Sequence, residues 1–203
     1  MPETARSELI LGGQRSGKSH RAELLARQWL ARSGCHRAVM IATGQPWDDE
    51  MAQRIAQHRS DRAARVPGMT TVEEPLALSS ALAANSQPDT LVVVDCLTLW
   101  LTNLLMPLSP RPPDADFSAN REPNVPPAHD SNAWVAMLLV AIDEAPGPVV
   151  LVGNEIGLGV IPMGRDTRAF VDALGRLNQD VAARCQRVTF MAAGLPLYLK
   201  GQP

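Results

Sequence analysis

The sequence predicts an α/β protein with a mostly parallel sheet flanked by helices. Short apolar runs alternate with helical patterns along the chain, and the first run breaks into a glycine-rich loop. The 203 residues suit one domain with a sizeable core. Apolar residues make up 45% and charged residues 20%, as in ordinary globular domains. We therefore expect residues 1–203 to form a single domain.

The first apolar run leads into a loop with the spacing of a phosphate-binding site. Gly12, Gly17, Lys18 and Ser19 fit the pattern G-x-x-x-x-G-K-[ST], whose small residues let backbone N–H groups approach phosphate oxygens. Lys18 would reach the β- and γ-phosphates, and the Ser19 hydroxyl would hold Mg²⁺. The helix beginning at Lys18 would point its positive end at the same anion. A strand before this loop and a helix after it predict a P-loop NTPase (RecA-like) fold.

A second strand and a helix follow. Residues 37–42 are apolar and end at a glycine-containing turn, so their exit loop would join the phosphate loop at the carboxyl edge of the sheet. From Asp48 the pattern becomes helical, with an acidic first turn and an apolar stripe at Met51 and Ile55.

On the polar side of that helix, His58 shares a face with Arg54 and Glu50 because the three residues are four apart. Two interpretations stay open from the residues alone. His58 is either a solvated histidine near a helix C-terminus, where the dipole favours it, or a histidine held among arginines beside a nucleotide.

A continuous β-branched run over residues 90–95 ends in the carboxylate of Asp95. In a phosphate-loop protein an aspartate at such a strand end helps to place Mg²⁺. Asp95 would also cap the buried helix predicted over 97–105, and the two roles are compatible.

The other elements are predicted from apolar periodicity and turn residues. Strands that alternate with helices imply right-handed crossovers. Residues 65–71 are expected to be irregular around a Pro-Gly turn. The remaining predicted helices are Lys18 to about Arg32, 75–84, 133–144 and 165–184, and the remaining strands are 70–73, 148–153, 187–193 and 195–200.

Two further segments stand apart. Seven prolines lie between residues 107 and 127, so we expect a mobile surface insertion at about 107–131 within the domain. The segment from Asn154 to Pro162 holds a polar pair and two glycines at the expected ligand edge. It is either a long turn or a loop that shapes the pocket for an acceptor or a nucleotide.

Charge and cysteine content limit the possible classes of function. A net charge of -2 gives no electrostatic reason to expect nucleic acid or an anionic membrane as a partner. Every apolar run falls short of the roughly 18 residues that a membrane span needs. Cys35, Cys96 and Cys185 are scattered and odd in number, which suits a reducing cytoplasm.

Several motifs, read in order, resemble the bifunctional adenosylcobinamide kinase/adenosylcobinamide-phosphate guanylyltransferase family of cobalamin biosynthesis. The resemblance runs from Leu9 to Lys200, apart from the proline-rich insertion. The motifs that carry it are Gly12–Ser19, Ile41–Thr43, Asp48–Met51, Arg54–Arg59, Asp95–Thr98, Thr102–Leu105, Asn154–Gly157 and Asn178-Gln179.

The resemblance implies two activities. The first transfers a γ-phosphate from GTP or ATP, with Mg²⁺, to the aminopropanol hydroxyl of adenosylcobinamide. In the second, His58 attacks the α-phosphate of GTP and carries GMP to the new phosphate as a phosphoramidate, which suits a neutral imidazole near pH 7. A homotrimer is also implied.

The same resemblance implies a set of nucleotide contacts. Ser60-Asp61 stands where the family often has Asp-Gly, and the spacing leaves Glu73 and Glu74 as alternatives for one contact. The implied contacts are Gly12, Gly13, Gln14, Arg15, Ser16, Gly17, Lys18, Ser19, Ala42, Thr43, Gly44, Arg59, Ser60, Asp61, Arg62, Glu73 and Asp95.

Two alternative functions remain open from the sequence. One is a monofunctional P-loop small-molecule kinase in which His58 takes no part. The other is a GTP-dependent switch protein, in which the proline-rich stretch would respond to the γ-phosphate.

Overall fold

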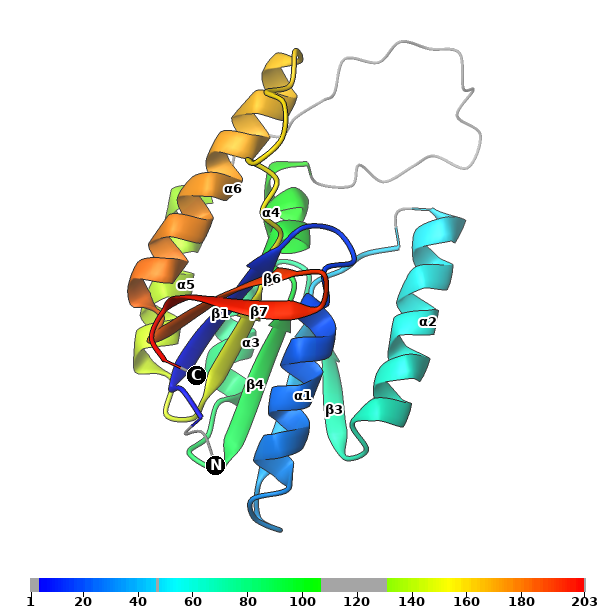
Figure 1. Ribbon diagram of the computed structural model, residues 1–203, viewed down its shortest axis with the longest axis vertical. Helices are drawn as coiled ribbons and strands as arrows, with labels where there is room; N and C mark the ends of the chain where they lie inside the picture. The colour runs from blue at the N-terminus through cyan, green and yellow to red at the C-terminus, as the bar shows by residue number, and fades with distance from the viewer. Residues whose placement is uncertain (1–3, 47, 107–130, 203) are drawn as a thin grey trace.

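The computed structural model describes residues 4–46, 48–106 and 131–202 (Figure 1). The predicted proline-rich insertion lies outside these residues, except for Ser131, which begins a helix. The strands are β1 (Ser7–Gly12), β2 (Arg37–Ala42), β3 (Met69–Glu73), β4 (Thr90–Asp95), β5 (Val149–Val152), β6 (Arg187–Ala192) and β7 (Leu195–Lys200). The helices are α1 (Lys18–Leu30), α2 (Asp49–Arg65), α3 (Leu78–Asn85), α4 (Leu97–Leu105), α5 (Ser131–Glu144) and α6 (Arg165–Arg184).

The strands form one seven-stranded sheet in the order β3-β2-β4-β5-β1-β6-β7. Every neighbouring pair is parallel except β6 and β7, which form an antiparallel hairpin at one edge. The predicted α/β class with a mostly parallel sheet is therefore confirmed.

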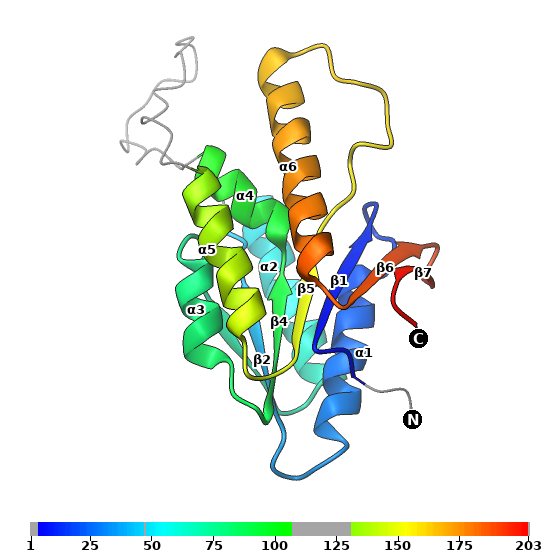
Figure 2. The same ribbon diagram turned by 90° about the vertical axis from the view of Figure 1, so that its left-hand side faces the viewer.

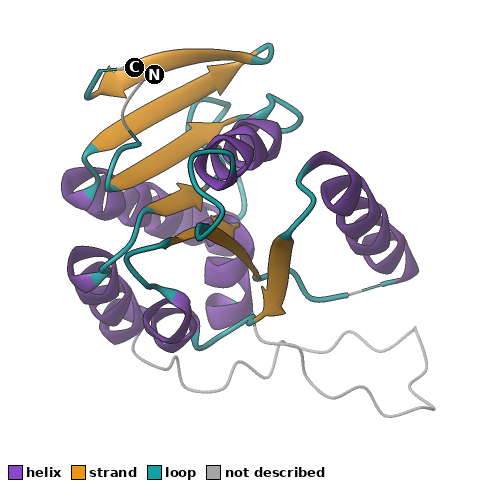
Figure 3. Ribbon diagram, turned by 90° about the horizontal axis from the view of Figure 1, so that it is seen from below, coloured by secondary structure: helices purple, strands orange, loops and turns teal. Residues whose placement is uncertain are grey.

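Helices cover both faces of the sheet (Figure 3). On one face α3, α4, α5 and α6 pack over β1, β4 and β5 around the fully buried Trp100. On the other face α1 packs over the same strands through Ala22, Leu25 and Trp29. Strands buried on both sides need continuous apolar runs, which is why residues 90–94 and 149–152 lack polar alternation.

Helix α2 lies at the β3 edge of the molecule (Figure 1) and differs from the others, because Arg62 is its one buried residue. Helices long and apolar enough to cross a bilayer do not occur in the described part of the chain.

Two predicted boundaries are wrong. The strand predicted over 70–73 is confirmed and begins one residue earlier, at Met69, so the irregular stretch predicted over 65–71 is wrong for residues 69–71, which pair in register with β2. The helix predicted from Pro75 begins at Leu78, since the Glu74 carboxylate accepts hydrogen bonds from the backbone N–H groups of Leu76 and Ala77 and holds a turn there.

Candidate active site

A row of residues at the carboxyl ends of neighbouring strands forms the floor of the site. Parallel pairing places Glu73 of β3 opposite Ala42 of β2. Ala42 in turn lies opposite Asp95 of β4, and Asp95 opposite Val152 of β5. Strand β1 extends the row, because Ile10 pairs with Val152 just before the phosphate loop begins. Carboxyl ends of parallel strands are where open α/β sheets bind ligands.

The loop after β1 has a conformation that side chains would block. A Cβ on Gly12 would lie 2.5 Å from the carbonyl oxygen of Met191, and Gly17 has a φ of 101° at the N-cap of α1. Lys18 is buried, and its Nζ donates to the carbonyl oxygen of Gly13 at 2.6 Å. The ammonium group is thus held against the loop where α1 begins, the part of a helix that binds anions.

Buried groups of opposite charge meet beside this loop. Burial raises the pKa of Asp95, and a hydrogen bond with the Ser19 hydroxyl and the charges of Arg62 and His58 oppose that shift. Burial also lowers the pKa of Lys18, against the charge of Asp95. Both shifts follow from taking charged groups out of water, and such perturbed groups in one cavity are typical of functional sites.

Helix α2 contributes the predicted histidine and two arginines. His58 is exposed and lies in the middle of α2, so it is not near a helix C-terminus. Arg62 is buried and donates to the Thr71 hydroxyl at 3.3 Å, while Arg59 forms an ion pair with Glu73. These contacts fix α2 to β3 and turn a cationic face toward the phosphate loop.

The strand ends, the phosphate loop and α2 enclose a cavity of about 820 Å³. Most of the predicted contacts line it. They are Gln14, Arg15, Ser16, Gly17, Lys18, Ser19, Ala42, Gly44, His58, Arg59, Arg62, Glu73 and Asp95.

The other predicted contacts do not form part of the cavity wall. Asp61 accepts hydrogen bonds from Gln57 at 2.6 Å and from Arg65 at 3.2 Å, within its own helix. Residues outside the wall are Gly12, Gly13, Thr43, Ser60 and Asp61.

Thr43 forms hydrogen bonds within the protein and does not face the cavity. Its fully buried hydroxyl donates to the carbonyl oxygen of Cys96 at 2.7 Å and accepts from the Cys96 N–H at 2.9 Å. The Asn103 side chain donates to the Thr43 carbonyl oxygen at 2.8 Å. These bonds hold the ends of β2 and β4 together directly under the cavity.

The surroundings of Glu73 and Glu74 distinguish these two alternatives for one nucleotide contact. Glu73 lines the cavity, whereas the Glu74 carboxylate is bonded to backbone N–H groups before α3. Of the two carboxylates, only that of Glu73 faces the space where a nucleotide would lie.

Sequence reasoning missed part of the wall. Met51 and Ile55 were expected as an apolar stripe of α2, and they face the cavity together with His58. Helical spacing places residues 51, 55, 58 and 62 on one face, which is the signal that links Met51 and Ile55 to His58, but it does not show that this face meets a cavity. The wall residues outside the predicted set are His20, Met51, Arg54, Ile55, Gln57, Cys96, Leu99, Val152 and Asn154.

Comparison with known proteins shows to which family the chain belongs. A family model described as cobinamide kinase / cobinamide phosphate guanyltransferase matches residues 8–199. The chain belongs to this family. The match spans the phosphate loop, α2, the strand ends and the hairpin, so it includes the whole cavity.

Curated relatives agree with this assignment over nearly their full length. The bifunctional adenosylcobalamin biosynthesis protein CobP of Pseudomonas aeruginosa is 46% identical over 196 residues, covering 97% of this chain and 98% of the relative. The bifunctional adenosylcobalamin biosynthesis protein CobU of Escherichia coli is 35% identical over 194 residues, covering 95% of this chain and 98% of the relative.

Solved structures show the fold. The flagellar accessory protein FlaH of Methanocaldococcus jannaschii matches with a TM-score of 0.50 at 11% identity, over 98% of this chain and 80% of that chain. A Pyrococcus horikoshii protein, PH0250, matches with a TM-score of 0.51 at 9% identity, over 99% of this chain and 89% of that chain. At such low identity the likeness concerns the arrangement of the sheet and helices alone.

Proposed function

We propose that this chain catalyses both reactions of its family in one cavity, and that the second reaction passes through GMP bound covalently to His58. The substrates would be adenosylcobinamide and then its phosphate. One observation carries the proposal: the phosphate loop and the exposed imidazole of His58 line the same cavity of about 820 Å³.

In the first reaction the aminopropanol hydroxyl oxygen attacks the γ-phosphorus, the bond from that phosphorus to the β-phosphate oxygen breaks, and the hydroxyl proton passes to water. Lys18 and the N-terminus of α1 stabilise the charge on the leaving phosphates. The donor is GTP, or ATP in this step. Most of the catalysis in such transfers comes from positioning and charge stabilisation.

Ser19 and Asp95 fit Mg²⁺, because a hydroxyl and a carboxylate lie side by side and a hard cation prefers oxygen ligands. The described residues hold no group of three or more His, Cys, Asp or Glu that would bind a metal alone, so phosphate oxygens and water would complete its coordination. Bound there, Mg²⁺ would neutralise charge on the transferred phosphate.

In the second reaction an imidazole nitrogen of His58 attacks the α-phosphorus of GTP and pyrophosphate leaves. Arg59 and Arg62, one and four residues further along α2, offset the negative charge that develops. A phosphate oxygen of adenosylcobinamide phosphate then attacks the same phosphorus, the N–P bond breaks, and His58 is restored. The product is adenosyl-GDP-cobinamide.

The test uses GTP labelled at the α- or the γ-phosphate, with Mg²⁺ and without a corrinoid. We expect protein-bound label from the α-position only, stable to alkali and lost in acid. His58→Ala should abolish this labelling. His20→Ala is the matched control, because His20 is another histidine of the same cavity, and labelling of this variant should persist. Absence of α-label at saturating GTP, with nucleotide binding intact, would leave a monofunctional kinase or a nucleotide-dependent switch.

The assembly is proposed to be a homotrimer in the cytoplasm that binds neither nucleic acid nor membranes. Leu195, Leu197 and Leu199 on the edge strand β7 are 70%, 59% and 58% exposed, and such a row supports contact between copies. Light scattering on the purified protein measures the molar mass, and a value of one chain would contradict this part.

A further inference from the structure

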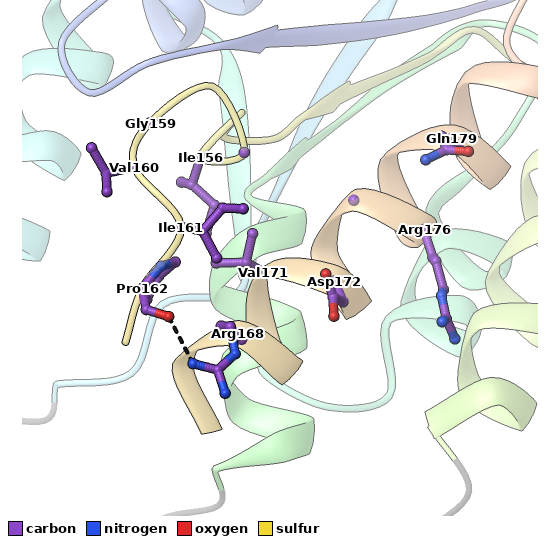
Figure 4. A pocket seen from close by; sticks show the side chains of 12 residues that line it. Ile156, Gly159, Val160, Ile161, Pro162, Arg168, Val171, Asp172, Arg176 and Gln179 are labelled. Atoms are coloured by element: carbon purple, nitrogen blue, oxygen red, sulfur yellow. Dashed lines mark hydrogen bonds between the residues drawn. The ribbon is translucent and has the colours of Figure 1, made fainter. Parts of the chain in front are cut away.

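A second hollow, separate from the nucleotide cavity, lies between α6 and the loop that precedes it (Figure 4). Its volume is about 530 Å³, within the range of small-molecule sites. Ile156 and Ile161 of the loop lie against Val171 of α6 and form an apolar floor.

The loop is ordered by bonds that leave its apolar side chains exposed. Arg168 of α6 donates to the carbonyl oxygens of Pro162 at 3.0 Å and Met163 at 2.5 Å. Val160 is nevertheless 97% exposed and Ile161 75% exposed. Large apolar side chains held open to water beside a hollow mark a binding surface.

The opposite wall is polar. Asp172, Arg176 and Gln179 come from one exposed side of α6 and line the hollow. In Figure 4 they follow one another along the helix beside the apolar floor. Together they supply hydrogen-bond donors and acceptors, the two kinds of partner that a carboxamide needs.

A short stretch of chain, residues 154–156, joins the wall of the hollow to the wall of the nucleotide cavity. Asn154 lines the nucleotide cavity and Ile156 lines the hollow. Between them, the Glu155 N–H donates to the carbonyl oxygen of Gly12 at 3.1 Å, which ties the junction to the phosphate loop. The buried Asn178 side chain holds the same junction through the Asn154 carbonyl oxygen at 3.1 Å. A molecule in the hollow would therefore have one end close to the bound phosphates.

We propose that this hollow between α6 and residues 156–162 is the subsite for the corrinoid acceptor, an inference that rests on the proposed function. A corrin is a flat apolar macrocycle with carboxamide side chains at its rim. The apolar floor suits the ring face and the polar side of α6 suits the rim. The aminopropanol arm then points through the junction at Glu155 toward the phosphate loop. Figure 2 shows α6 and its preceding loop projecting beyond the carboxyl edge of the sheet.

The test is Val160→Asp, which places a carboxylate on the loop wall of the hollow, beside the apolar floor, at a position too exposed to affect folding. In the γ-phosphate transfer we expect the KM for cobinamide to rise at least tenfold, with kcat within about twofold. Labelling of the protein by α-labelled GTP without a corrinoid should be unchanged. Val140→Asp, a matched exposed valine on α5 that lines neither cavity, should leave the KM for cobinamide unchanged.

A second measurement separates this inference from the proposed function. Equilibrium dialysis with dicyanocobinamide, followed by its visible absorption, measures corrinoid binding without catalysis. Weaker binding to Val160→Asp and to Gln179→Ala than to the unsubstituted protein supports the subsite even where no phosphate is transferred. Equal binding by all three proteins overturns it. A loss of molar mass in Val160→Asp, with unchanged corrinoid binding per chain, shows instead that a second copy covers the hollow.

Discussion

Replacing Gly12 by alanine should destabilise the protein strongly. The new Cβ would lie 2.5 Å from the carbonyl oxygen of Met191 on β6 and 2.6 Å from the Ser16 hydroxyl, at a φ of 152°. A non-glycine residue in such a region costs about 1–3 kcal/mol, and the forced separation of packed atoms adds about 1–3 kcal/mol. We therefore expect a loss of about 2–6 kcal/mol in the free energy of unfolding.

The assay is urea unfolding followed by tryptophan fluorescence, because Trp29 and Trp100 are both buried. With a slope of about 3 kcal/mol per molar urea, a loss of about 3 kcal/mol lowers the midpoint by about 1 M. Gly13→Ala is the matched control, since its Cβ would meet nothing within 4 Å. Its free energy of unfolding should change by less than about 1 kcal/mol.

Equal midpoints for Gly12→Ala and Gly13→Ala would refute this reasoning. They would show that β1 moves away from β6 without loss of packing. Nucleotide affinity in the same two variants then tells whether the loop conformation has changed.

Three other outcomes are expected. Thr43→Val should lower the free energy of unfolding by about 1–3 kcal/mol in urea titration, because the Cys96 N–H and carbonyl oxygen lose their hydrogen bonds with the Thr43 hydroxyl. Thr43→Ser keeps a hydroxyl, so its free energy of unfolding should fall by less than half as much. Asp95→Asn should raise the free energy of unfolding at pH 7 and abolish phosphate transfer. Because burial raises the pKa of Asp95, the unsubstituted protein loses stability as the pH rises above the ordinary pKa of 3.8. The urea midpoints of the two proteins should therefore converge below that pH. Iodoacetamide at pH 8 should label only Cys35 in the native protein, as shown by peptide mass, because burial raises the pKa of both Cys96 and Cys185 to about 12.

Each of these has a contrary result. Equal losses for the valine and serine variants would show that the Thr43 hydroxyl is not what holds the strand ends. A constant stability difference for Asp95→Asn from pH 3 to 7 would mean that its carboxyl is not desolvated. Labelling of Cys96 as fast as Cys35 would show that the cavity wall opens readily.

Local signals predicted most of the fold. The phosphate loop, the strand ending at Asp95 and the helices were predictable because glycine spacing, β-branched runs and helical periodicity act over a few residues. Residues 69–71 were predicted less clearly, because the preceding Pro-Gly turn favours an irregular segment whereas residues 70–73 favour a strand. They become a strand only by pairing with residues 38–40 of β2.

Only part of the site was predicted, because the partners of some site residues lie far along the chain. Periodicity shows that Met51 and Ile55 share a face of α2, but it does not show whether that face meets the core or a cavity. Thr43 was expected to touch the nucleotide, yet its hydroxyl bonds to Cys96, a residue far along the chain. The covalent role of His58 stays a prediction, carried by family resemblance and by its place in the cavity.

The strand order also governs when the nucleotide cavity can form during synthesis. β1 is made first, but its partners are β5 and β6, which begin at Val149 and Arg187. At the usual pace of translation, β1 would wait on the order of ten seconds for its first neighbour. Until then its apolar face and the phosphate loop have no sheet to support them. A nascent chain therefore should not bind nucleotide until almost all of the sequence has left the ribosome.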